Sequence, residues 1–70
     1  MQYEDIKKVI DSAKESDVLE FTIHNNTFAF TKNKCDFEVG SIQTIIYVND
    51  VKSRLIIDNL RINKINIIRR

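Results

Sequence analysis

The segment SIQTIIYVNDVKSRLIIDNLRINKINIIRR, residues 41–70, decides the fold because Ile and Val recur in it too densely for anything but buried, extended strands. The polar pairs Asn49-Asp50 and Asp58-Asn59 interrupt it, and such pairs are typical of tight turns. The pattern therefore predicts three successive strands joined by short turns. Their expected ranges are about 42–48, 51–57 and 60–68.

The last of these strands has an irregular apolar pattern. Leu60 and Ile62 occupy even positions, whereas Ile65 and Ile67 occupy odd ones. One extra residue at a β-bulge would return all four to the same face and would bend the strand. We expect that bulge at Asn63-Lys64.

The first forty residues predict one helix and three more strands. Apolar residues recur at helical spacing from Tyr3 onward, which predicts a helix over about 3–15. Alternating apolar and polar residues then predict strands over about 18–24, 27–32 and 35–39. Turns at Asn25-Asn26 and Asn33-Lys34 would keep the apolar members of these strands on one face.

The expected fold is α+β within a single domain of residues 1–70. An N-terminal helix is followed by a five- or six-stranded antiparallel meander, which forms a strongly twisted sheet or a small open barrel. Successive hairpins need no long crossover connection. In the order of one helix and then several short strands, the chain is similar in outline to Sm-like and other small barrels, although the Sm signature Gly and Asp positions are absent.

A chain of 70 residues buries little surface, so its stability usually needs further support. The single cysteine, Cys35, excludes an internal disulfide, and with His24 as the one histidine no zinc site of ordinary spacing can form. We expect no cofactor. The remaining support is a partner subunit, so we expect a homo-oligomer. The strands over 18–24 and 60–68 are the expected sheet edges, which could pair between chains or close a barrel. The alternative is a closed monomer whose helix covers the exposed face.

Other classes of protein are disfavoured by what the sequence lacks. No apolar run is long enough to span a membrane, and no signal peptide pattern begins the chain, so we expect a cytoplasmic protein. The only glycine, Gly40, cannot build a phosphate-binding loop, and no catalytic triad or pair of carboxylates has suitable spacing. We therefore expect that the protein is not an enzyme.

The charge distribution indicates a candidate surface. Residues 41–70 carry six basic and two acidic residues, a net +4, whereas residues 1–40 carry five basic and eight acidic residues, a net −3. A two-residue turn at Asn49-Asp50 would place Tyr47 opposite Lys52, and Ile45 opposite Arg54, on the outward face. The predicted partner- or anion-binding residues are Tyr47, Lys52, Arg54 and Arg61, with Arg69 and Arg70 at the periphery.

Two classes of function follow from these features. The favoured one is a small non-catalytic protein-binding regulator or inhibitor that acts on a protein target. In size and composition the chain is similar to accessory proteins of phages and mobile elements from AT-rich bacteria, a class that includes inhibitors of host defence. The alternative is a small-barrel module that binds nucleic acid or a nucleotide-like anion through the basic face. That face could equally be a self-assembly contact or a solvated surface.

Overall fold

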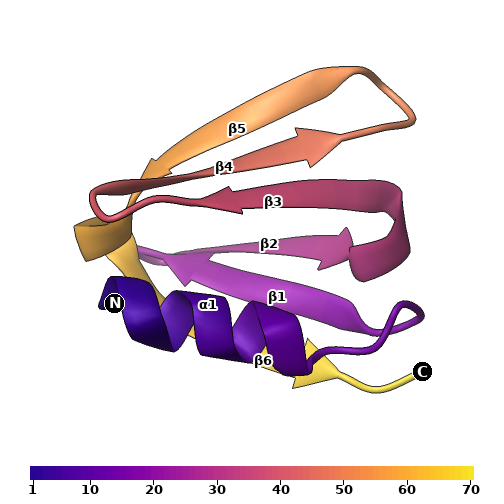
Figure 1. Cartoon of the computed structure of the whole chain (residues 1–70), viewed down its shortest axis with the longest axis horizontal. Coiled ribbons are helices and arrows are strands. Elements are labelled where there is room, and N and C mark those ends of the chain that lie inside the picture. The colour runs from indigo at the N-terminus through magenta and orange to yellow at the C-terminus, as the bar shows by residue number, and fades with distance from the viewer.

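One α-helix, six strands and two short 3₁₀ helices make up the computed structural model, which describes residues 1–70 (Figure 1). The elements are α1 (Tyr3–Ser12), β1 (Val18–Ile23), β2 (Asn26–Thr31), η1 (Lys32–Lys34), β3 (Cys35–Val39), β4 (Gln43–Val48), β5 (Ser53–Asp58), η2 (Asn59–Arg61) and β6 (Ile62–Ile68). The expected N-terminal helix and antiparallel strands are confirmed. The helix ends at Ser12, three residues earlier than expected, because the backbone of Ala13 is extended.

The strands form two separate three-stranded sheets instead of one continuous meander. Their orders are β2-β1-β6 and β3-β4-β5, and every pairing is antiparallel. The expected pairings of β2 with β3 and of β5 with β6 are therefore wrong. β6 returns to pair with β1, so β1, which was expected at an edge, is the central strand of its sheet.

The connection between β2 and β3 leaves the first sheet because other contacts hold it. The backbone amide of Lys32 donates to the carbonyl of Asp17 at 2.9 Å, which fixes η1 against the loop before β1. The Lys32 ammonium group also donates to the carbonyls of Ile10 (2.8 Å) and Ala13 (2.7 Å) at the end of α1. A cation at a helix C-terminus satisfies carbonyls that have no partner inside the helix. These bonds hold η1 away from a simple hairpin turn.

The connection between β5 and β6 is fixed by a buried asparagine. Asn59 is only 3% exposed. Its side-chain amide donates to the Gly40 carbonyl at 2.8 Å, and its side-chain oxygen accepts a hydrogen bond from the Thr44 hydroxyl at 2.7 Å. The N-terminal ammonium group of Met1 donates to the Asn59 carbonyl at 2.8 Å. Leu60, which was expected to face the core, is instead 84% exposed in η2.

In the β1–β2 hairpin, the side chains face the expected sides of the sheet, but each residue pairs with a different partner from the expected one. The turn between β1 and β2 consists of His24 and Asn25, so Phe21 lies opposite Phe28 and not opposite Phe30. His24 accommodates this turn with a φ of 56°. A two-residue displacement preserves the side-chain phase, and Phe21 is therefore fully buried as the alternation predicts.

The expected bulge in the last strand is present at Asn63. Thr22 pairs with Lys64 and Ile23 with Ile62, which leaves Asn63 as the extra residue of β6. The Asn63 side-chain oxygen accepts a hydrogen bond from the backbone amide of His24 at 3.2 Å. The bulge thereby returns Ile62, which is 2% exposed, to the buried face.

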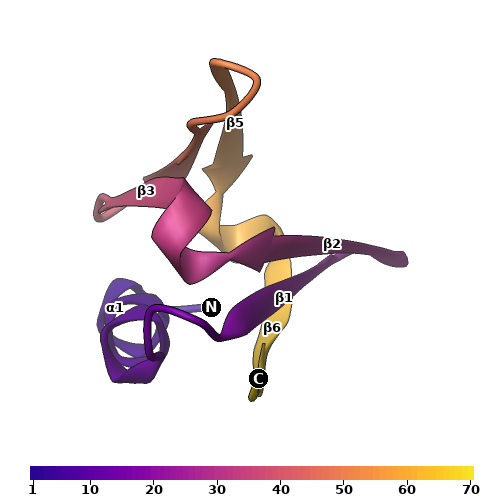
Figure 2. The ribbon, with the colours of Figure 1, turned by 90° about the vertical axis from the view of Figure 1, so that its right-hand side faces the viewer.

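The core lies between the two sheets and α1. It consists of Ile6, Ile10, Ala13, Leu19, Phe21, Cys35, Ile46, Ile57 and Ile62. The helix contacts β3 and β6, and so covers the seam between those two strands (Figure 2). No element covers the corresponding seam between β2 and β5, which therefore stays open. None of the helices has the length and apolarity required to cross a membrane.

Candidate functional site

The six predicted binding residues separate into three groups. Tyr47, Lys52 and Arg54 line one hollow of about 410 Å³ at the end of the β4–β5 hairpin, which we call the hairpin hollow. Arg61 lies in η2 and lines a different hollow. Arg69 and Arg70 follow β6 at the C-terminus of the chain. The structure therefore brings three of the six residues together.

The hairpin forms differently from the expected two-residue turn. Val48 pairs with Ser53, so the loop has four residues, 49–52, and Tyr47 lies opposite Arg54 instead of Lys52. Lys52 ends the loop with a φ of 50°. Ile45 pairs with Ile56, where Arg54 was expected.

Carboxylates lie among the cations of the hairpin hollow. Asp36 is part of its lining. The Tyr47 hydroxyl donates to the Glu38 carboxylate at 3.2 Å, so the ring is already held by an acidic neighbour. A surface that attracts phosphate groups is usually uniformly basic. The hairpin hollow therefore carries charges of both signs.

Arg69 has a structural partner. Its guanidinium group donates to the Asp17 carboxylate at 3.0 Å, and Asp17 is only 1% exposed. The Lys14 amide donates to the same carboxylate oxygen at 2.9 Å. The pKa of Asp17 is lowered, first by this Lys14 hydrogen bond and then by the charge of Arg69, against the opposing effect of burial. Arg69 therefore helps to hold the loop before β1.

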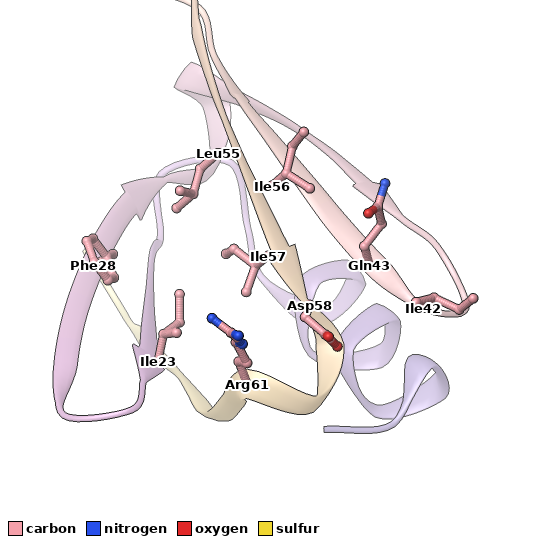
Figure 3. A pocket seen from close by; sticks show the side chains of 9 residues that line it. All are labelled: Ile23, Phe28, Ile42, Gln43, Leu55, Ile56, Ile57, Asp58 and Arg61. Atoms are coloured by element: carbon pink, nitrogen blue, oxygen red, sulfur yellow. The ribbon is translucent and has the colours of Figure 1, made fainter.

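A second hollow, of about 420 Å³, lies at the open seam, and we call it the β2–β5 hollow. Figure 3 shows Phe28 and Ile23 on one side of the opening, with Leu55 and Ile57 on the other. The Arg61 side chain reaches from η2 toward the space between Ile23 and Ile57. The full lining is Ile23, Phe28, Ile42, Gln43, Leu55, Ile56, Ile57, Asp58 and Arg61.

The apolar lining is partly exposed because β2 and β5 do not pair with each other. Phe28 shares the inward face of β2 with Phe30, since it lies opposite the fully buried Phe21. Phe28 is nevertheless 40% exposed. On the other side of the seam, Ile57 is 4% exposed and Leu55 is half-buried. The core thus continues outward to the hollow and stops there.

The strand edges that border this hollow have no backbone partners. β2 and β5 each pair on one side only. The eight backbone hydrogen bonds outside the helices and strands include none from either strand. β2 also carries no charged residue in its sequence NTFAFT, whereas charge, proline and bulges are the usual means of blocking an exposed edge. The β2 edge is therefore open to another extended chain.

The groups that could support catalysis are placed unfavourably for it. No three His, Cys, Asp or Glu residues gather so that they could hold a metal ion. Burial, and then the nearby charges of Asp36 and Asp50, raise the pKa of the Cys35 thiol, so the thiolate needed for nucleophilic chemistry is disfavoured. His24 is exposed at the turn between β1 and β2.

The β2–β5 hollow was not predicted from the sequence. The predicted pairing of β2 with β3 would use the β2 edge that the structure leaves free. One sequence feature could have indicated the open β2 edge. Residues 26–31 carry no charge, in a chain of which 30% of the residues are charged.

No protein-family model matches the sequence, and neither the curated proteins nor the solved structures contain a significant match. The function is therefore inferred from the chemistry and geometry of this chain.

Proposed function

We propose that this protein is a non-catalytic binding module, a regulator or inhibitor, that captures an extended segment of a protein target along the β2 edge. The observation that carries the proposal is the uncharged, unpaired edge of β2 beside an apolar hollow. In strand addition, main-chain hydrogen bonds supply affinity, and pockets for alternate side chains supply specificity. The β2 edge and the β2–β5 hollow offer both.

The register of the hairpin determines which amides of β2 are available. A two-residue turn makes Ile23 and Asn26 a hydrogen-bonded pair. Such pairs alternate along an antiparallel ladder, so Glu20 and Ala29 form a pair whose amides point away from one another. The amides of Thr27, Ala29 and Thr31 therefore point toward the open edge. A target segment can bond to these groups without disturbing β1.

The lining of the hollow indicates the chemistry of the target segment. Every second side chain of an added strand would point inward, toward Phe28 and Leu55. Those target positions should be aliphatic or aromatic. Arg61 lies at the η2 end of the hollow, where an acidic target residue would meet an opposite charge.

Selection from a displayed library of random extended peptides tests this proposal. Peptides selected on the wild-type chain should lose binding to Phe28→Asp, which places a charge in the hollow, and to Ala29→Pro, which removes an outward N–H. Proline is tolerated on an edge strand whose N–H faces solvent, so the Ala29→Pro chain should remain folded. Amide hydrogen exchange should slow at residues 27, 29 and 31 when peptide binds.

A matched control is Ile68→Asp, because Ile68 is 39% exposed, close to the 40% of Phe28, and lies on β6 instead of β2. This variant should bind the selected peptides as the wild type does. Selected peptides that bind Ala29→Pro with unchanged affinity, or that require Tyr47 and Arg54, would show that the site is elsewhere.

A further inference from the structure

We infer that two copies of this chain associate through antiparallel pairing of their β5 edges about a two-fold axis at Ile56. This interaction goes beyond the capture of a target, because it uses the other strand that borders the open seam. β5 reads Ser53-Arg54-Leu55-Ile56-Ile57-Asp58. Centred on Ile56, the pairing sets Arg54 of each copy opposite Asp58 of the second copy. An interface of this kind uses the same patch on both subunits and closes at the dimer.

The backbone of β5 presents the required hydrogen-bonding groups. The Asn59 amide donates to the Ile42 carbonyl at 2.9 Å, which makes these two opposed residues a hydrogen-bonded pair. Bonded pairs alternate along the ladder, so Ile57 and Leu55 also direct their amides toward β4. The amides of Arg54, Ile56 and Asp58 consequently point to the free edge. The two-fold axis then passes through a pair of Ile56 residues that can exchange both of their hydrogen bonds.

Charge distinguishes β5 from the other exposed edges. Arg54, Ile56 and Asp58 are all exposed on the outer face of β5, with the apolar residue between the two opposite charges. Self-pairing therefore forms two Arg–Asp contacts around a central contact between isoleucines, and cross-strand pairs of these types are favourable. Asp58 accepts from the Leu60 amide through Oδ1 at 3.0 Å, which leaves its other oxygen available to Arg54 of the second copy.

The remaining edges lack this complementarity. The corresponding pairing of β3 about Phe37 would set Asp36 opposite Glu38 of the second copy, and like charges in that position are destabilising. β3 and β6 are also the strands that α1 contacts. The sequence of β2 from Thr27 to Thr31 reads the same in both directions, so it could pair with itself, but it carries no charge that would favour one partner or register.

Pairing through β5 would also change the β2–β5 hollow, whose lining includes Ile56 and Asp58. Leu55 and Ile57 face the β2–β5 hollow, and the proposed register places Leu55 beside Ile57 of the second copy on that same inner face. The second copy would thereby enlarge the apolar lining. The β2 edge remains free in each copy, so target capture and self-association use separate edges. The β4–β5 hairpin extends away from the helix and from β1 (Figure 2).

Reversal of one charge at a time provides the test, with sedimentation equilibrium across micromolar to millimolar concentrations as the readout. The wild-type chain should reach twice its monomer mass. Arg54→Glu sets two carboxylates against each other at both contacts, and Asp58→Arg sets two guanidinium groups against each other, so each variant should associate about tenfold or more weakly. An equimolar mixture of these two variants should recover a dimer. In the mixed pair, one contact joins the two unchanged residues and the other joins the two substituted residues. Each contact then joins opposite charges.

Two further variants keep the test decisive. Asp58→Asn replaces Asp58→Arg in the test if the arginine variant fails to fold. The asparagine retains an acceptor for the Leu60 amide, so this variant should weaken association without loss of folding. Arg61→Glu changes an exposed cation outside β5 and should leave the dimer intact. A wild-type chain that stays monomeric at millimolar concentration would overturn the inference. So would a dimer that Ala29→Pro dissociates while the β5 charge variants do not, since that result assigns self-association to β2.

Discussion

Replacement of Asn59 by alanine should be among the most destabilising single changes in this chain. Its side chain makes two hydrogen bonds, to the Gly40 carbonyl at 2.8 Å and from the Thr44 hydroxyl at 2.7 Å. Each contributes about 1 kcal/mol net, and Thr44, which is 0% exposed, would keep a hydroxyl without a partner at a further cost of about 1–3 kcal/mol. We expect Asn59→Ala to lower the free energy of unfolding by about 3–5 kcal/mol.

That loss is large for this protein because a domain of this length has a total stability of roughly 4–10 kcal/mol. Urea denaturation followed by circular dichroism should show a lower midpoint with an unchanged m-value. Asn66→Ala is the matched control, since Asn66 is exposed on β6 and should change the stability by less than about 0.5 kcal/mol.

A double-mutant cycle with Thr44→Val then separates the contact from the two single effects. The two substitutions together should cost less than the sum of their separate costs, by about 0.5–3 kcal/mol, because each alone leaves one buried group without its partner. If Asn59→Ala lies within about 0.5 kcal/mol of the wild type, the buried network does not hold η2 in place.

Three other changes have defined outcomes. Lys32→Met should lower stability by about 1–2 kcal/mol and speed amide exchange in α1, because the last carbonyls of the helix lose their donor. Asp17→Asn should destabilise the protein at neutral pH. The folded-state pKa of Asp17 lies below its ordinary value of 3.8. The stability that the Asp17 carboxylate contributes is therefore present above pH 3.8 and is lost as the pH falls through the folded-state pKa. The urea midpoints of the wild type and the variant should converge below about pH 4. Gly40→Ala should cost about 1–3 kcal/mol in the same assay, since its Cβ would lie 2.8 Å from the Gln43 carbonyl oxygen, whereas Ser41→Ala should not.

The faces of the strands were predictable because burial imposes a two-residue period. Phe21 and Ile46 are fully buried, as the alternation around each predicts. The bulge at Asn63 was predictable for the same reason, since Ile62 and Ile65 can share a face only if one residue is left over. The registers of the hairpins were harder to predict from the sequence. Asn tolerates turn conformations well, yet His24 takes the positive φ in the first hairpin.

The division into two sheets could not be predicted from local pattern. It depends on contacts between distant residues, such as the Lys32 ammonium group with the end of α1 and Asn59 with Gly40. The candidate site follows the same rule. Tyr47 and Arg54 come together because a local hairpin pairs them, whereas the role of Arg69 depends on Asp17, 52 residues away in sequence. The β2–β5 hollow exists only because β2 and β5 do not pair. The local periodicity of a sequence cannot predict which strands stay unpaired.

The open seam links the stability of this chain to its binding. A helix covers the seam between β3 and β6, but the core on the opposite side ends at Phe28, which remains 40% exposed. A strand added there would bury apolar surface that a chain of 70 residues cannot cover by itself. Any ligand that binds only the folded state stabilises it, by about 2.7 kcal/mol at a concentration one hundred times its Kd. Capture of a target segment on β2 should therefore raise the melting temperature of the wild type and leave that of Ala29→Pro unchanged.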